Sequence, residues 1–171
     1  MIKTLSKTIT VLDAIATCTG KLIAPLTLVM VLLTSIVVTA RYLFETGAVV
    51  LTESVMYLHG IVFMLGIAYT LKDGGHVRVD ILYQRFSDKG RAIIDLAGAV
   101  FFLFPVCIFI LWSSFDYVAM SWRMQEGSAE PGGLPGVFVF KTLVPAMALL
   151  LMLQGIAEAL RAVKQLLFPY A

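Results

Sequence analysis

Four long runs of apolar residues alternate with shorter polar segments along the chain. The runs cover residues 22–40, 49–71, 93–120 and 137–160. A bilayer core about 30 Å thick is crossed by about 20 helical residues, at 1.5 Å of rise per residue. Each run is close to that length or longer. The pattern therefore predicts an all-α integral membrane protein with four transmembrane helices, in which residues 1–171 form a single membrane domain.

Two further segments are amphipathic rather than uniformly apolar. Apolar residues recur at helical spacing from Leu5 to Ala16, which predicts either a short helix lying on the membrane or an extension of the first span. Between the second and third runs, apolar side chains from Val79 to Phe86 share one helical face, and Asp80 is placed to cap its start. This segment predicts a second short helix in the membrane interface.

Composition supports burial in lipid rather than in a protein core. Hydrophobic residues make up 60% of the chain and charged residues 14%, whereas soluble domains are about 45–50% apolar and about 25% charged. A chain of this size cannot bury so much apolar surface by itself, so lipid must cover the remainder. The net charge of +2 is too small to indicate nucleic acid as a partner.

The basic residues divide unevenly between the two sides of the predicted membrane. One side, which carries both termini and the loop between the second and third spans, holds Lys3, Lys7, Lys21, Lys72, Arg78, Arg85, Lys89, Arg91, Arg161 and Lys164. The other side holds Arg41, Arg123 and Lys141. Cytoplasmic segments carry the excess of Lys and Arg in membrane proteins. We therefore expect both termini to be cytoplasmic.

Two ionisable residues in the second span are candidates for function. Glu53 lies about one turn inside the outer boundary and His59 lies nearer the middle of the membrane. They could form an ion or proton relay, or they could be intramembrane polar contacts to another helix or to a partner subunit. Asp116, near the outer end of the third span, is placed within reach of water or a neighbouring loop. Close helix packing is expected at Gly60, Gly66, Gly98 and Gly155.

Catalytic and metal-binding patterns are not evident. Cys18 and Cys107 lie far apart in apolar sequence, whereas a redox or zinc site needs closely placed thiols. A membrane redox enzyme would also need haem-ligating histidines. We therefore expect neither an enzyme nor a metal site. A small oligomeric transporter or channel, using Glu53 and His59, is the alternative to a helper subunit.

Several segments resemble a known family of membrane subunits. Gly75-His76-Val77-Arg78-Val79-Asp80 follows the second span, and the outer loop reads Gly127-Ser128-Ala129-Glu130-Pro131-Gly132-Gly133-Leu134-Pro135. Together with residues 141–145 and 153–158, these segments resemble the small permease subunit, of DctQ type, of tripartite ATP-independent periplasmic (TRAP) transporters. The outer loop looks closest to the branch named for mannitol or chloroaromatic compounds.

The resemblance implies a scaffold in the bacterial inner membrane. Such a subunit binds a large permease subunit that moves substrate and sodium, and a periplasmic substrate-binding protein delivers the substrate, typically an organic acid. No cofactor is implied beyond, at most, a bound phospholipid. Taken with the resemblance, the polar and charged outer residues are expected to form a periplasmic docking surface: Arg41, Glu45, Arg123, Glu126, Ser128 and Glu130. The cytoplasmic loop anchors the subunit at the lipid headgroups through His76, Arg78, Asp80, Arg85 and Lys89.

Overall fold

The computed structural model describes residues 2–45, 47–76, 83 and 85–168, and every regular element in these ranges is helical. The first two spans are α1 (Ile2–Phe44) and α2 (Val49–Lys72). The third is built from α4 (Asp88–Gly98), a π-helical turn η1 (Ala99–Leu103) and α5 (Phe104–Met124). The fourth combines α6 (Val137–Lys141) with α7 (Leu143–Leu167). All four predicted spans are confirmed as helices long and apolar enough to cross a membrane.

The N-terminal amphipathic segment continues into the first span without a break. Helix α1 is 43 residues long and includes Pro25. Two alternatives were open for the N-terminal segment, and the structure shows that it extends the first span. Whether this segment lies at the membrane interface stays a prediction. The helix predicted from Val79 to Phe86, with Arg78 and Asp80 beside it, falls largely outside the described residues.

Prolines explain why the third and fourth spans are not continuous α-helices. Proline has no backbone N–H, so the carbonyl four residues before it loses its helical partner. Pro105 follows the π-helical turn, in which the N–H of Phe104 bonds the carbonyl of Ala99, five residues back. Pro145 likewise has no N–H to donate to the carbonyl of Lys141. Helix α6 ends at Lys141, and Thr142 joins α6 to α7. Both interruptions are local, and the spans remain long rods.

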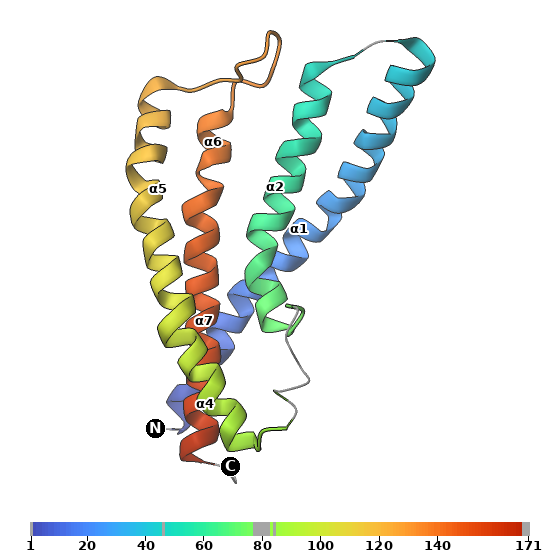
Figure 1. The fold of residues 1–171 in the computed structure, drawn as a ribbon. Coiled ribbons are helices and arrows are strands. Elements are labelled where there is room, and N and C mark those ends of the chain that lie inside the picture. Colours follow the sequence, from blue (N-terminus) through green and yellow to red (C-terminus); the bar gives the residue numbers. More distant parts are fainter. Residues whose placement is uncertain (1, 46, 77–82, 84, 169–171) are drawn as a thin grey trace.

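The four spans form two leaning pairs (Figure 1). Helices α1 and α2 pack together, α5 packs on α6 and α7, and α7 also contacts α1, α2 and α4. Figure 1 shows the start of α1 and the end of α7 at the same end of the molecule, which we call the termini end. The opposite end, where the α1–α2 pair leans away from α5 and α6, carries residues 125–136 and is called the loop end.

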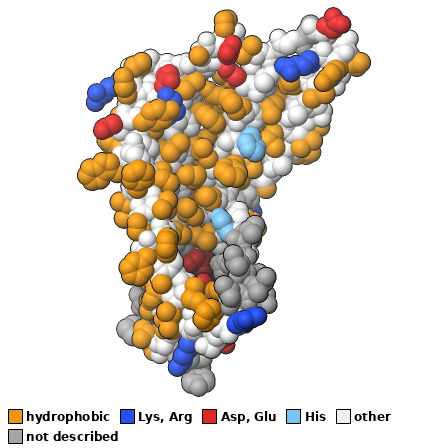
Figure 2. Space-filling model, viewed as in Figure 1, with side chains coloured by type: hydrophobic (Ala, Val, Ile, Leu, Met, Phe, Trp, Pro, Cys, Tyr) orange, Lys and Arg blue, Asp and Glu red, His pale blue; other side chains and the backbone are white. Residues whose placement is uncertain are grey.

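The interior of the bundle is made of small residues, while large apolar side chains face outward. Buried positions include Ala16, Ala68, Ala148 and Ala157, and small side chains of this kind let helix backbones approach closely in membranes. Figure 2 shows apolar side chains covering the visible face between charged groups near its two ends. This is the surface expected of a bundle whose outer solvent is lipid.

Candidate functional site

The side chain of Glu53 holds the loop that closes the loop end. It projects from the first turns of α2, where its Oε2 accepts the backbone N–H of Leu134 at 2.6 Å. Its Oε1 accepts the hydroxyl of Ser128. One carboxylate thereby joins two positions of the loop, Ser128 and Leu134, to a helix that is 75 or more residues away in sequence. The predicted intramembrane polar contact of Glu53 is a contact to a loop of its own chain.

A second carboxylate, Glu126, holds the start of the same loop. Its Oε2 accepts the hydroxyl of Ser121 and the ammonium of Lys141, each at 2.6 Å. These two hydrogen bonds, that of Lys141 first, keep the pKa of the Glu126 carboxyl below its ordinary value. The ammonium of Lys141 also lies 4.1 Å from the centre of the Tyr117 ring. Lys141 therefore connects α6 with both the end and the interior of α5.

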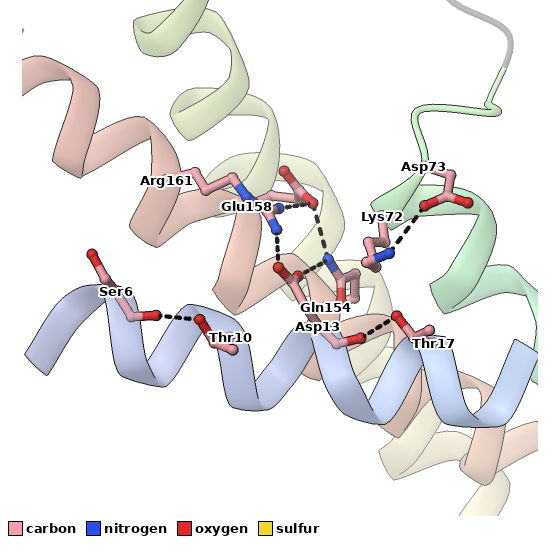
Figure 3. Close-up of polar contacts among 9 residues, drawn as sticks. All are labelled: Ser6, Thr10, Asp13, Thr17, Lys72, Asp73, Gln154, Glu158 and Arg161. Atoms are coloured by element: carbon pink, nitrogen blue, oxygen red, sulfur yellow. Dashed lines mark hydrogen bonds and ion pairs between the residues drawn. The ribbon is translucent and has the colours of Figure 1, made fainter. Parts of the chain in front are cut away.

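At the termini end, four polar side chains tie α1 to α7 (Figure 3). Arg161 pairs with Asp13 and with Glu158, and Gln154 donates to Asp13 at 3.1 Å and to Glu158 at 3.0 Å. We call these four residues the inner cluster. Gln154 is 1% exposed, so its amide is taken out of solvent by the packing of the helices. A buried polar group of this kind costs free energy unless it is hydrogen-bonded.

The inner cluster was only partly foreseen from the sequence. Glu158 and Arg161 pair at a spacing of three residues on α7, a spacing at which opposite charges on one helix are neighbours. The contact to Asp13 spans 148 residues and was missed. The available signal was that Asp13 is the single acidic residue of α1, in a helix that otherwise carries only basic charges.

The predicted periplasmic docking residues divide into two groups in the structure. Glu126 and Ser128 are half-buried and are used within the chain. The remaining four, Arg41, Glu45, Arg123 and Glu130, are exposed at the loop end. Glu45 follows α1 with a left-handed backbone (φ 51°), and Gln125 ends α5 in the same way (φ 47°). The four exposed charges are accessible from solvent, whereas Glu126 and Ser128 form hydrogen bonds that hold the loop in place.

The predicted cytoplasmic anchors lie around the termini end where they are described. His76, Arg85 and Lys89 are exposed, and Arg78 and Asp80 lie outside the described residues. Next to them, the carboxylate of Asp73 accepts hydrogen bonds from Tyr69 and Lys72, which lower the pKa of this carboxyl. Lys72 lies in the last turn of α2, where its positive charge offsets the negative end of the helix dipole.

The four glycines predicted at helix contacts have different surroundings. A Cβ at Gly60 would lie 2.5 Å from the Phe140 ring, and one at Gly155 would lie 2.5 Å from Leu103. A Cβ at Gly66 would meet Ile23 at 3.3 Å, while one at Gly98 would meet nothing within 4 Å. Gly60 and Gly155 therefore sit where helices of this chain meet, and Gly98 faces open space in the isolated subunit.

Glu53 and His59 do not share a site. His59 is exposed beside Phe63 in a groove between α1 and α2, lined also by Thr34, Ser35 and Thr52. Glu53 instead is bonded to the outer loop. Within the described ranges, no three His, Cys, Asp or Glu side chains are grouped as metal ligands. The arrangement is that of a bundle whose polar groups hold its own ends together.

Comparison with known proteins supplies a family. A family model described as "Tripartite ATP-independent periplasmic transporters, DctQ component" matches residues 30–165, which is well over half of the chain. No curated protein and no solved structure matched the sequence of this chain.

Proposed function

The chain belongs to the DctQ component family of tripartite ATP-independent periplasmic transporters, and on this premise we propose that it is the membrane scaffold of a sodium-coupled transporter for organic acids or related small solutes. It binds the large permease subunit and offers part of the surface on which the periplasmic binding protein docks. The family match over residues 30–165 is the observation that carries this proposal.

The internal contacts support a structural role. Glu53 and Glu126 bond the outer loop, and Asp13, Glu158 and Arg161 bond one another. Groups fixed in this way stabilise one geometry of the bundle, which suits a subunit that stays still while a partner moves. The alternative, an oligomeric channel that uses Glu53 and His59, requires these side chains to face one path, yet Glu53 is bonded to the outer loop and His59 lies in the groove between α1 and α2.

The loop end is proposed as the periplasmic face. The described basic residues at the termini end outnumber those at the loop end, and such an excess is typical of the cytoplasmic side. A fluorescent protein fused to the C-terminus should fluoresce, and alkaline phosphatase fused there should be inactive. The reverse result would place the loop end in the cytoplasm and would exclude it as a docking surface for a periplasmic protein.

The test of the scaffold role is reconstitution. The tagged chain, expressed with its genomic neighbours and purified in mild detergent, should bring down a large polytopic subunit in about equal amount. Vesicles that contain both subunits should take up solute only when the binding protein and a sodium gradient are present. Vesicles with this chain alone should take up nothing. A chain that purifies without a large subunit, or that transports alone and loses transport in Glu53→Gln, would overturn the proposal.

Docking at the loop end has a sharper test, because the structure separates exposed from internal charges. Glu130→Lys should reduce uptake at limiting binding protein by about three- to tenfold, since charge reversal at an interface rim mainly slows association, while both membrane subunits still co-purify. Glu126→Gln, which weakens the loop without reversing an exposed charge, is the comparison. Unchanged dependence on binding protein in Glu130→Lys would remove this loop from the docking surface.

A further inference from the structure

Two polar side chains on α5 face outward and have no partner within the described chain. Asp116 is exposed, and Trp112, one turn earlier, is 84% exposed. Neither forms a hydrogen bond or an ion pair with another described residue, unlike the acidic groups of the outer loop. An unpaired carboxylate and an unpaired indole N–H are ordinary at a water-exposed surface, so their depth in the membrane decides what they mean.

The neighbouring contacts fix that depth. The indole of Trp122 donates to the hydroxyl of Thr142 at 2.9 Å, at the start of α7, and Trp122 fits the aromatic belt at the membrane boundary. Asp116 is six residues further into the helix, or about 9 Å deeper, and Trp112 is ten residues further, or about 15 Å deeper. Leu103, at the other end, meets Gly155 beside the inner cluster. If Trp122 marks the boundary, Asp116 falls on its hydrocarbon side, deeper than its place near the outer end of the predicted span suggested, and Trp112 falls near the middle of the span.

Lipid is a poor neighbour for this face. An ionised carboxylate is costly to place among lipid tails, and ionisable residues within membrane spans generally face protein or water. The surrounding side chains are large and exposed: Phe109 is 70% exposed and Phe115 is 73% exposed. Of these two, Phe115 also lines a groove of about 550 Å³ between α5 and α7, together with Trp112, Asp116 and Met152. Aromatic side chains around a central polar group are typical of energetically important contacts in interfaces.

We propose that this α5 face, consisting of Phe109, Trp112, Phe115 and Asp116, is where a transmembrane helix of the large permease subunit docks. That helix places a basic or hydrogen-bond-donating side chain opposite Asp116 and an acceptor opposite the Trp112 indole. The assignment rests on the proposed scaffold role and adds to it which side of the subunit meets the partner. Charge complementarity selects the occupant, since neither lipid tails nor the Asp116 of a second copy can neutralise this carboxylate.

The groove between α1 and α2 is the competing face. It exposes His59, but no Asp, Glu, Lys or Arg side chain lines it. The hydroxyls of Thr34, Ser35 and Thr52 are already bonded to carbonyls of their own helices. The α5 face therefore has the greater need for a protein neighbour.

Site-specific photocrosslinking in intact membranes distinguishes the two faces. Benzoylphenylalanine is introduced at Phe115 on α5 or at Phe63 beside His59, two phenylalanines that are 73% and 66% exposed. The full transporter is expressed in both cases. The adduct from Phe115 should contain the large permease subunit, and Phe63 should give little. An adduct with a second copy, no protein adduct from Phe115, or equal capture from both positions would overturn the assignment.

Substitution of the acid supplies a second readout. Asp116→Lys should lower the large subunit recovered per inserted small subunit by about three- to tenfold, the range measured for polar contacts between membrane helices. Asp116→Asn removes the charge but can still form hydrogen bonds to the partner helix, so it should reduce the recovery of the large subunit by less. The amount of inserted chain controls for folding. If wild-type chain recovers no large subunit, the scaffold proposal fails. If wild type recovers it and both Asp116 variants do so equally well, only the α5 assignment fails.

Discussion

The backbone N–H of Leu134 donates to the carboxylate of Glu53 across 81 residues of sequence, at 2.6 Å. This bond ties the loop that follows α5 to the first turns of α2. These elements contact each other little elsewhere at the loop end, where the α1–α2 pair leans away from α5 (Figure 1). Glu53 therefore provides a polar link between the two helix pairs at that end, in addition to the apolar contact between the rings of Tyr57 and Phe140.

Removing the Glu53 carboxylate should free the outer loop. Glu53→Ala leaves the Ser128 hydroxyl and the Leu134 N–H without their acceptor, which should lower the free energy of unfolding by about 1–3 kcal/mol. The loss should appear as a lower thermal midpoint in detergent and as faster proteolysis within residues 125–136. Glu130→Ala is the matched control, because its carboxylate is exposed in the same loop. Equal behaviour of the two variants would show that the Glu53 contacts contribute nothing to loop order.

The inner cluster should couple α1 to α7 energetically. A double-mutant cycle of Asp13→Ala and Arg161→Ala isolates their interaction. The side chains of Arg161 and Asp13 are 37% and 21% exposed, so a coupling of about 1–2 kcal/mol is expected, between the values for exposed and buried pairs. Thermal unfolding of the detergent-purified chain measures it. Additive effects of the two substitutions would mean that the interaction between Asp13 and Arg161 contributes no free energy to stability.

The spans were predictable from the sequence because their cause is local. Hydrophobic length decides whether a segment crosses a bilayer, and that is countable along the chain. The ends of α2, for instance, are Val49–Lys72 in the structure against 49–71 predicted. The contacts of Glu53 and Asp13 depend on which helices become neighbours, and apolar helices carry little pattern that selects one neighbour over another. Ser128 was accordingly assigned to a docking surface, although its hydroxyl is bonded to Glu53.

Gly60 and Gly98 should respond oppositely to the same substitution. Gly60→Ala places a methyl group 2.5 Å from the Phe140 ring, which is itself packed 4.5 Å from Tyr57, so a shift costing about 1–3 kcal/mol is expected. Gly98→Ala meets nothing within 4 Å, and alanine is favoured over glycine in helices by about 1 kcal/mol. Thermal midpoints of the isolated chain should fall for the first and rise for the second. A rise in both would show that the Phe140 ring moves aside freely.

The contact between Glu126 and Lys141 should survive mild acid. The folded-state pKa of the Glu126 carboxyl is depressed from its ordinary value of 4.5, so its stabilisation is fully present above pH 4.5 and is lost as the pH falls through the lower, folded-state value. Hydrogen exchange of residues 125–136, corrected for the intrinsic pH dependence, should therefore be constant from about pH 5 to 8. In Glu126→Gln the protection should be weaker and the decline below pH 4.5 should be smaller than in wild type, because only the Glu53 carboxylate, which bonds the same loop, can still be protonated. Wild-type protection that falls already between pH 7 and 5 would show that another group, not this carboxylate, controls the loop.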